Sequence, residues 1–314
     1  MGTAASAFEV SRLENRSLTY DLDLSPAEVS CLLDLTAEVK QNPGRYTDAL
    51  QGRYLSLLFE KPSLRTRLTF EVAAKQLGAD SILSVGPVGD REPVKDVARN
   101  LDRWTNCIVA RTFSQVTIDE LARWSSVPVI NALSDVYHPC QALADVFTLR
   151  EHFTDLAGLK LAFIGDGNNV AHSLMLTATR LGVSVGVASP PGYEPKAEIT
   201  KLAAALAEAA GTRVTVSNDA AEVLAEADAV YTDVWASMGQ EGQKSQRLKD
   251  FGPYQVDEKL MAMAKPEAVF MHCLPAKRGE EVADSVIESP RSVVFDQAEN
   301  RLHTQKALLL MLLA

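Results

Sequence analysis

The chain has 314 residues, of which 46% are hydrophobic, and it carries a formal net charge of −10. This size and apolar content allow a sizeable buried core and indicate two domains or one large α/β unit. The acidic balance argues against broad nucleic-acid binding, which needs a basic face. No stretch approaches the roughly 18 uncharged apolar residues of a membrane span. Because the N-terminus also lacks a signal-peptide pattern, we expect a cytoplasmic protein with no membrane partner.

The cysteines argue against a fold held together by disulfides or by a structural metal. Cys31, Cys107, Cys140 and Cys273 are widely spaced and form no C-x-x-C pair. We therefore expect neither disulfides nor a structural zinc site.

In chain order, a helix at about Pro26–Lys40 precedes short apolar runs, rich in β-branched residues, that alternate with amphipathic segments. Such alternation is typical of βαβ units and a parallel sheet. In the first half the expected strands are Tyr54–Phe59, Ser81–Val85, Cys107–Arg111 and Val127–Asn131. The helices expected between them are Arg67–Gly78, Val94–Trp104 and Ile118–Trp124.

The same alternation recurs in the second half. Its expected strands are Lys160–Ile164, Ser184–Ala188, Arg213–Ser217, Ala229–Thr232 and Ala268–Met271. Its expected helices are Val170–Leu181, Pro195–Ala210, Ala220–Ala225 and Val256–Ala264. The polar segment Gly239–Tyr254 is longer than an ordinary connection, and we interpret it as a mobile substrate loop.

A helix at Pro139–Phe153, opened by a proline at its first turn, is expected to join the halves. The last helix, Glu299–Leu313, is almost wholly apolar over 307–313 and must pack against other elements. We therefore predict an α/β fold of two doubly wound parallel-sheet domains, residues 1–150 and 151–314. The interdomain helix links them, and the C-terminal helix, about 299–314, packs back on the first domain.

The most informative segment is Ser63-Leu64-Arg65-Thr66-Arg67, which leaves a strand and enters a helix. Free N–H groups at a helix start, hydroxyls and guanidiniums together favour anion binding. A capped helix with surface arginines would explain this segment equally well if it stood alone. Two other features favour the anion site. Arg111 ends an apolar strand, where parallel sheets bind ligands, and His138-Pro139-Cys140-Gln141 opens the interdomain helix.

These three motifs resemble the carbamoyl phosphate site shared by the aspartate and ornithine carbamoyltransferases, and the resemblance covers nearly the whole chain. It implies that Ser63, Arg65 and Thr66 hold the phosphate. It also implies that Arg111, His138 and Gln141 contact the phosphate or the carbamoyl group. Leu64 stands where this family commonly has threonine.

Two motifs of the second half follow expected strands, namely Asp233-Val234-Trp235-Ala236-Ser237-Met238-Gly239 and His272-Cys273-Leu274-Pro275. An aspartate suits a cationic α-amino group, whereas a site for aspartate would need basic residues. In isolation, Met238 would be a core residue and Cys273 an inert buried thiol.

Both motifs resemble those of ornithine carbamoyltransferases. The resemblance implies that Asp233, Ser237 and Met238 bind ornithine and that Cys273 and Leu274 lie beside the carbamoyl group. It also implies a cis Leu274–Pro275 bond.

Gly165-Asp166-Gly167-Asn168-Asn169 is not a dinucleotide fingerprint, because Val170 replaces the third glycine and no acidic residue ends the next strand. By the resemblance, an asparagine of this loop binds ornithine; Asn168 is the best match and Asn169 a close rival. Arg301 is placed near carbamoyl phosphate, whereas His303 fits a solvated helix start. The implied carbamoyl phosphate site is Ser63, Leu64, Arg65, Thr66, Arg111, His138, Pro139, Cys140, Gln141, Cys273, Leu274 and Arg301.

The implied reaction moves the carbamoyl group to the side-chain amine of ornithine, giving citrulline and phosphate, without a metal or organic cofactor. The catalytic residues would be Arg65, Arg111, His138 and Cys273. The acceptor could instead be putrescine, N-acetylornithine or N-succinylornithine, or the chain could bind carbamoyl phosphate without catalysis.

The resemblance further implies a homotrimer in which a loop around Ser84–Pro93 reaches the neighbouring site. Here Pro87 and Gly89-Asp90-Arg91-Glu92 stand where those enzymes usually carry a glutamine and a Gly-Arg-Gly-Glu run. What this loop contributes to the neighbouring site is therefore left open.

Overall fold

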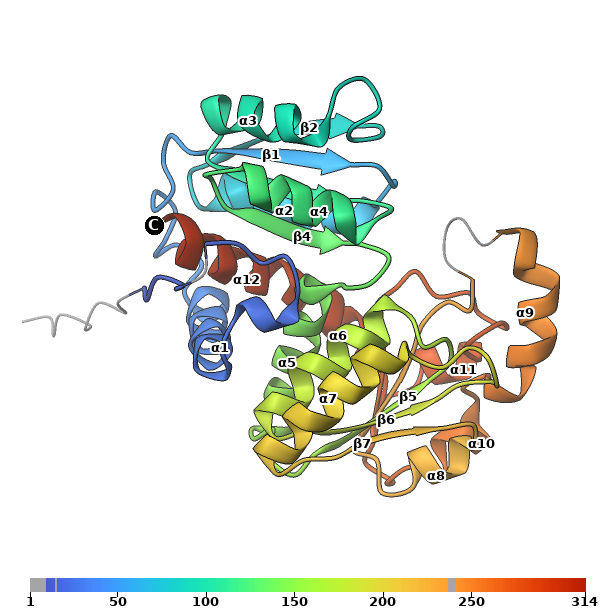
Figure 1. The fold of residues 1–314 in the computed structure, drawn as a ribbon. Helices are drawn as coiled ribbons and strands as arrows, with labels where there is room; N and C mark the ends of the chain where they lie inside the picture. The colour runs from blue at the N-terminus through green and yellow to red at the C-terminus, as the bar shows by residue number, and fades with distance from the viewer. Residues whose placement is uncertain (1–9, 15, 237–240) are drawn as a thin grey trace, which may run out of the picture.

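The computed structural model describes residues 10–14, 16–236 and 241–314. They form an α/β fold with two parallel sheets, joined by helices and lying one above the other in Figure 1. This arrangement confirms the predicted fold class. Among the described residues, no helix combines the length and apolar character needed to cross a membrane. Cys31, Cys107, Cys140 and Cys273 are free thiols.

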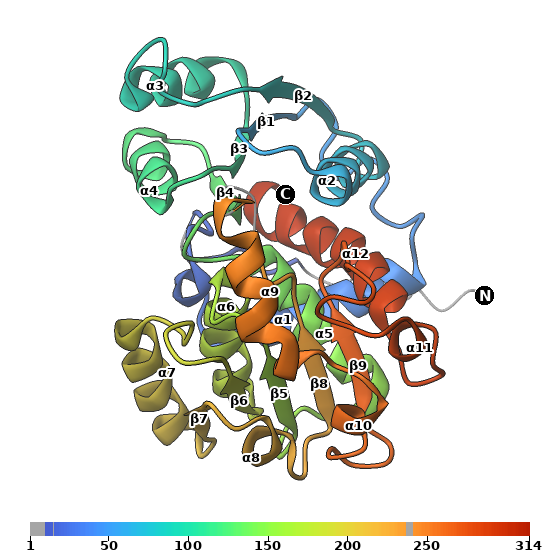
Figure 2. The ribbon, with the colours of Figure 1, turned by 90° about the vertical axis from the view of Figure 1, so that its right-hand side faces the viewer.

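The first sheet has the strand order β2-β1-β3-β4, and its pairs are parallel. Its strands are β1 (Tyr54–Phe59), β2 (Asp80–Val85), β3 (Cys107–Arg111) and β4 (Val129–Leu133). Its helices are α2 (Leu64–Gln76), α3 (Val94–Trp104) and α4 (Gln115–Trp124). Helices α3 and α4 cover one face and α2 the other (Figure 2), so the sheet is doubly wound.

The second sheet has the order β7-β6-β5-β8-β9, again with parallel pairs. Its strands are β5 (Lys160–Ile164), β6 (Ser184–Ala188), β7 (Val214–Ser217), β8 (Ala229–Thr232) and β9 (Val269–His272). The helices of this half are α6 (Asn169–Ala178), α7 (Ala197–Ala210), α8 (Ala220–Leu224), α9 (Lys244–Phe251), α10 (Glu258–Met261) and α11 (Asp284–Ile287). Short 3-10 turns are η1 (Asp21–Asp23), η2 (Thr179–Leu181), η3 (Glu241–Gln243) and η4 (Gly252–Tyr254).

Three helices hold the halves together: α1 (Pro26–Gln41), α5 (Pro139–Phe153) and α12 (Val294–Leu313). Helix α12 returns from the second half and packs against α1, α2 and α5, as predicted (Figure 1). Its leucines Leu308, Leu309 and Leu310 are at most 1% exposed. Burial of each such side chain stabilises the fold by about 1.5–3 kcal/mol, which explains why an apolar C-terminus docks.

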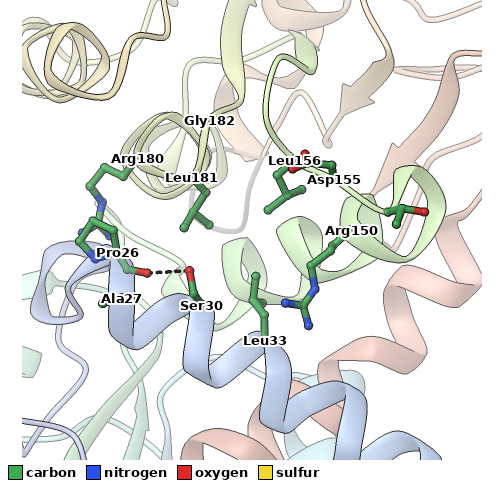
Figure 3. A pocket seen from close by; sticks show the side chains of 11 residues that line it. Pro26, Ala27, Ser30, Leu33, Arg150, Asp155, Leu156, Arg180, Leu181 and Gly182 are labelled. Atoms are coloured by element: carbon green, nitrogen blue, oxygen red, sulfur yellow. Dashed lines mark hydrogen bonds between the residues drawn. The ribbon is translucent and has the colours of Figure 1, made fainter.

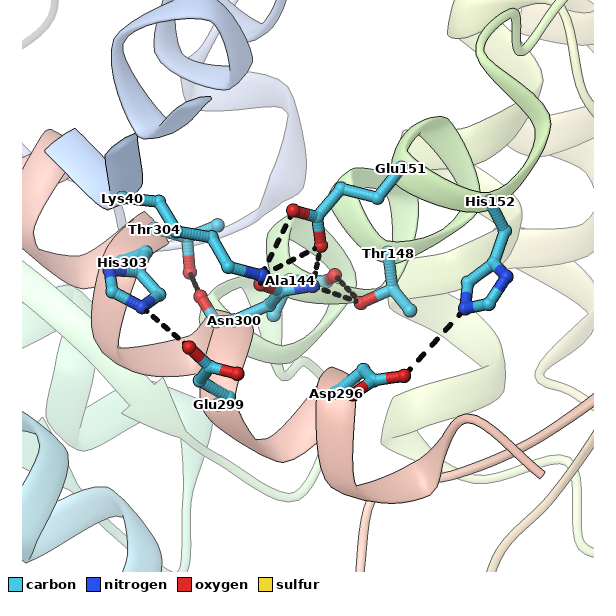
Figure 4. Close-up of polar contacts among 10 residues, drawn as sticks. All are labelled: Lys40, Ala144, Thr148, Glu151, His152, Asp296, Glu299, Asn300, His303 and Thr304. Atoms are coloured by element: carbon cyan, nitrogen blue, oxygen red, sulfur yellow. Dashed lines mark hydrogen bonds and ion pairs between the residues drawn. The ribbon is translucent and has the colours of Figure 1, made fainter. Parts of the chain in front are cut away.

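A polar cluster fixes the start of α12, as Figure 4 shows. Asn300 Nδ2 donates to Thr148 Oγ1 of α5 at 3.0 Å and to Glu151 Oε2 at 2.7 Å. Lys40 Nζ of α1 donates to Asn300 Oδ1 at 2.8 Å and pairs with Glu151 at 2.9 Å. One asparagine therefore ties the three joining helices together.

Several predicted boundaries were wrong. Strand β4 begins at Val129 rather than at residue 127, because Pro128 has no N–H and Leu18 pairs alongside Ile130. Helix α12 begins at Val294, five residues before the predicted Glu299. The helix predicted at 256–264 is reduced to α10, since Val256 is instead held in a bridge to Val282.

The segment predicted as a loop at 239–254 is helical over most of its described part. Residues 241–254 form η3, α9 and η4 in succession, whereas 239 and 240 lie outside the described residues. Helix α9 is held by tertiary contacts of Arg247 and Phe251, both of which are buried. The interpretation of this segment as a loop is therefore wrong for residues 241–254.

Candidate active site

The carboxyl ends of the strands converge where the strand order of each sheet reverses. In the first sheet this switch lies between β1 and β3, and in the second between β5 and β8. Ligands of open α/β sheets bind at such points. The end of β3 and segments that follow β1, β4, β5, β8 and β9 line one cavity of about 850 Å³ between the two halves. Its volume is typical of a small-molecule site.

Twelve of the predicted site residues line this cavity, although they come from both halves of the chain. They are Ser63, Leu64, Arg65, Thr66, Arg111, His138, Gln141, Asn168, Asp233, Cys273, Leu274 and Arg301. Pro139 and Cys140 lie beside it without lining it. The thiol of Cys140 donates instead to the Asn131 carbonyl at 3.4 Å. Ser237 and Met238 lie outside the described residues.

One wall of the cavity is built for an anion. Ser63 caps α2 by accepting from the Thr66 N–H at 3.3 Å, so the positive end of the helix faces the cavity beside the Arg65 side chain. Arg301 from α12 reaches across and donates to Thr66 Oγ1 at 2.8 Å. This contact places the C-terminal helix in the site although it follows the phosphate motif by more than 200 residues.

The guanidiniums of this wall are desolvated, as their lowered pKa values show. Burial, and then the neighbouring Arg301, lowers the pKa of Arg111 to about 10, which still leaves it charged at neutral pH. Burial also lowers the pKa of Arg65 and that of Arg301. Guanidiniums gathered in a desolvated site repel one another, so the arrangement favours a bound anion.

His138 and Gln141 open α5 at the centre of the cavity. Burial, followed by Arg301 and Arg111, lowers the pKa of His138 well below 6.5, so the imidazole is neutral at pH 7. Gln141 Nε2 donates to Asp145 Oδ1 at 2.8 Å, which leaves its carbonyl oxygen free of partners among the described residues. Burial raises the pKa of Asp145 to about 7.

Several buried polar atoms of this wall have no hydrogen-bond partner among the described residues: Arg111 Nε, His138 Nδ1, Gln141 Oε1 and Arg301 Nε. Buried polar groups in folded proteins are normally satisfied. Their concentration here indicates a ligand that offers both donors and acceptors.

The lining contributed by the second half of the chain centres on Asp233, which follows β8. Its Oδ2 accepts from Asn168 Nδ2 at 2.8 Å, and its Oδ1 accepts from the Val234 N–H at 2.8 Å and from the Cys273 thiol at 3.0 Å. Asn168 also caps α6 through Val170 and Ala171. These contacts fix the carboxylate where a cation entering the cavity would meet it.

The turn after β9 has an unusual backbone. The Leu274–Pro275 bond is cis, as predicted, and Leu274 has φ 56°. His272 holds this turn from below: its Nδ1 accepts from the Leu274 N–H at 2.8 Å, and its Nε2–H donates to Glu281 at 3.1 Å. The turn thereby presents Cys273 and Leu274 to the cavity.

Asp233, His272 and Cys273 offer possible metal-ligand atoms within 4.8 Å of one another. Both ring nitrogens of His272 are engaged in the bonds just described, and the thiol donates to Asp233. A metal would have to break each of these bonds, so the donor set fits a hydrogen-bond network better than a metal site.

Sequence reasoning missed the side wall formed by α9. Arg247 donates to Asp166 Oδ2 at 2.9 Å and to the Trp235 carbonyl at 2.6 Å, and it lies against the rings of Tyr193 and Phe251. Arg247 and Asp166 are far apart in sequence, and no local motif indicates their pairing. Other lining residues that were missed include Lys61, Ser134, His172, Lys196, Lys244 and Lys277.

A second hollow, of about 460 Å³, lies between α1, the end of α5 and η2 (Figure 3). Its two arginines are already engaged. Arg150 pairs with Asp34 at 2.7 Å, and Arg180 donates to the carbonyls of Leu24, Asp21 and Leu176. With its cations already paired, this hollow is a poorer candidate for an anion site than the interdomain cavity.

Comparison with known proteins decides the family. A model described as "Aspartate/ornithine carbamoyltransferase, carbamoyl-P binding domain" matches residues 16–151, and "Aspartate/ornithine carbamoyltransferase, Asp/Orn binding domain" matches residues 157–312. The chain belongs to the aspartate/ornithine carbamoyltransferase family. The resemblance inferred from its motifs is thus confirmed.

Relatives within this carbamoyltransferase family match over nearly their whole length. The ornithine carbamoyltransferase of Anoxybacillus flavithermus is 50% identical over 308 residues, which cover 96% of this chain and 98% of that protein. That of Thermus thermophilus is 51% identical over 292 residues, covering 92% and 93%. The solved structure of the ornithine carbamoyltransferase from Pyrococcus furiosus superposes with a TM-score of 0.93 at 45% identity, covering 97% and 99%.

Proposed function

We propose that this chain transfers the carbamoyl group of carbamoyl phosphate to the side-chain amine of L-ornithine, giving L-citrulline and phosphate. The observation that carries the proposal is one cavity lined both by the guanidiniums of Arg65, Arg111 and Arg301 and by the carboxylate of Asp233. Such a cavity suits a phosphate donor and an acceptor with a cationic end. The full-length similarity to ornithine carbamoyltransferases supports the same assignment.

The chemistry is attack of a neutral amine on the carbamoyl carbon. The new C–N bond forms, a tetrahedral oxyanion develops, and the C–O bond to phosphate breaks, while the amine loses a proton to solvent. Positioning and electrostatic stabilisation can supply most of the rate enhancement. In our proposal Arg65, Arg111 and the neutral His138 donate to the carbonyl oxygen and the phosphate as their charge grows.

The acceptor is held by the opposite wall. The Asp233 carboxylate binds the α-amino cation, and Asn168, which donates to Asp233 at 2.8 Å, keeps it oriented. An acceptor with an acylated α-amino group has no charge to pair with Asp233. This contact is therefore the basis of the proposed preference for ornithine, and Ser237 and Met238 complete the ornithine site in the proposal.

Cys273 takes part without forming a covalent intermediate. Burial, and then Asp233, raises the pKa of its thiol well above 9, so the thiol is protonated at neutral pH. Only the thiolate is a good nucleophile. We assign Cys273 and Leu274 to the binding of the carbamoyl group.

We further propose that residues 1–150 form the carbamoyl phosphate domain and residues 151–314 the ornithine domain. The family models, which meet between residues 151 and 157, support this division. The assembly proposed is a cytoplasmic homotrimer. An apolar face on α2 and the edge strand β2, formed by Leu64, Leu68 and Val85, supports association because monomers rarely expose such patches.

The function is tested by the rate of citrulline formation in wild type and in Arg65→Ala. We expect turnover to fall about 100-fold or more in the variant, as for loss of one oxyanion donor. Lys75→Ala is the control, because Lys75 lies at the far end of α2, 64% exposed and paired with Asp80. Near-normal turnover in Arg65→Ala would exclude the assigned role.

A further inference from the structure

A buried carboxyl lies where the two halves meet, outside the lining of the interdomain cavity. Asp21, in η1 near the start of the chain, is only 3% exposed. Its Oδ2 accepts from Ser173 Oγ at 2.6 Å, and its Oδ1 accepts from Thr177 Oγ1 at 2.9 Å. Both hydroxyls belong to α6 in the second half of the chain, so this one carboxyl binds a helix of the other half by two hydrogen bonds.

Ser173 connects Asp21 to the active site, because it also contacts His138. The backbone N–H of His138 donates to Ser173 Oγ at 2.8 Å. The serine therefore donates to Asp21 and accepts from His138 with the same oxygen, and both bonds are buried. A hydroxyl engaged in this way has no freedom to rotate, which fixes the position of the His138 backbone.

Asp21 itself is held from both sides. Just before it, Leu18 pairs with β4 of the first sheet, through Leu18 N to Val129 O at 2.9 Å and Asn131 N to Leu18 O at 2.7 Å. On the other side, Arg180, drawn beside Pro26 in Figure 3, donates to the Asp21 carbonyl at 2.7 Å. A continuous set of contacts thus runs from the first sheet to His138.

Burying the carboxylate of Asp21 has an energetic cost. Burial raises the pKa of Asp21 to about 6, although Ser173, Thr177 and Arg180 act in the opposite direction. A residue that only needed to pack at this place would be better apolar, because hydrophobic replacements of buried charges are often neutral or stabilising.

We propose that Asp21 and Ser173 are positioning residues. They hold His138 in the position from which its imidazole donates to the carbamoyl oxygen. They act through the His138 backbone and touch neither substrate. The inference rests on the proposed role of His138 in the reaction. It concerns the transition state rather than binding of the acceptor, because the Asp233 wall is left unchanged.

The test compares Ser173→Ala with Thr177→Val. Each variant removes one hydroxyl that donates to Asp21 from α6, and both residues are buried, but only Ser173 contacts His138. We expect both to lower the melting temperature. Only Ser173→Ala should lower kcat for citrulline formation, by about tenfold to 100-fold, as for a misplaced catalytic group. Its KM for ornithine should stay within about twofold, since acceptor contacts remain.

Equal kcat values in Ser173→Ala and Thr177→Val, each measured on protein shown by circular dichroism to be folded, would overturn the proposal. If Ser173→Ala does not fold, Asp21→Leu serves instead. It offers no acceptor to the Ser173 hydroxyl, so Ser173 is no longer fixed and kcat should fall below that of Thr177→Val. A kcat equal to that of Thr177→Val would refute the positioning role.

His138→Asn, measured in parallel, separates this inference from the proposed function. If His138→Asn is inactive and Ser173→Ala is normal, the positioning role alone fails. If His138→Asn keeps wild-type turnover, the proposed role of His138 fails, and the inference fails with it.

Discussion

Arg111, Arg301 and His138 form one desolvated group, and their protonation states follow from their mutual proximity. Burial and the two cations keep His138 in its neutral form, so the imidazole can donate one N–H without adding a third charge. The guanidiniums remain cations even though burial lowers their pKa values. These three groups therefore keep their charge states through the neutral pH range.

This constancy makes a prediction about pH. Because His138 has a lowered pKa, it stays neutral as pH rises from 6, and it contributes no loss of activity there. The acceptor amine, with a reference pKa of about 10.4, gains its reactive neutral form over the same range. We expect kcat/KM for ornithine to rise steadily between about pH 6 and 9. A flat profile over that range would contradict attack by a free amine.

A second prediction concerns the thiols. Burial raises the pKa of Cys273 well above 9 and that of Cys140 to about 12, whereas Cys31 is exposed. Iodoacetamide at pH 7.5 should therefore alkylate Cys31 first, with Cys273 at least about tenfold slower. Peptide mass spectrometry over time measures both rates. Labelling of Cys273 as fast as that of Cys31 would indicate a thiolate and reopen a nucleophilic role.

Helix α12 links the core to the active site, since its apolar end completes the core and its first half carries Arg301 into the cavity. Asn300 is the polar anchor of this helix (Figure 4). We expect Asn300→Ala to reduce the free energy of unfolding by about 1–3 kcal/mol, because it removes the hydrogen bonds of the buried Asn300 to Thr148, Glu151 and Lys40. Urea unfolding measures the loss.

Glu299→Gln is the matched control for that variant. Glu299 is 54% exposed, and among the described residues its side chain contacts His303, at 3.2 Å. We expect a change within about 0.5 kcal/mol, as for most substitutions at the surface. Equal losses in the two variants would mean that the Asn300 cluster does not anchor α12.

The sequence predicted most elements because their signals are local. Ser63 at a helix start and Arg111 at a strand end are recognisable from neighbouring residues. Because the carboxyl ends of parallel strands lie at one edge of a sheet, the sequence also predicts that the two residues share a site. Helix α9 was missed because its sequence, Lys244–Phe251, is polar and lacks an apolar period. Its stability comes from the Arg247–Asp166 pair and from ring contacts, which depend on residues distant in sequence.

At the scale of the whole molecule, the apolar face on α2 and β2 remains uncovered. Leu64 is 71% exposed and Val85 67% exposed, and Leu68, one helical turn after Leu64 on the same side of α2, is 46% exposed. If this face joins subunits, Leu68→Glu should convert a trimer to monomers, because a charge would be buried in the interface. Sedimentation velocity at micromolar concentration measures the state.

Leu202→Glu is the control for assembly, since Leu202 is 38% exposed on α7 of the other half. This variant should remain trimeric. A wild-type protein that sediments as a monomer, or a trimeric Leu68→Glu variant, would contradict the proposed interface.

The cavity combines elements from both sheets, so the proposed donor and acceptor sites meet only where the two halves join. The most direct test of the central claim is the rate of phosphate release from carbamoyl phosphate with ornithine, putrescine, N-acetylornithine and aspartate as parallel acceptors. We expect ornithine to be preferred over each of the others, with citrulline as product. N-acetylornithine lacks the cation that pairs with Asp233, and putrescine lacks the amino-acid carboxylate beside it. A preference for putrescine or an acylated ornithine, or no turnover with any acceptor, would contradict the proposed function.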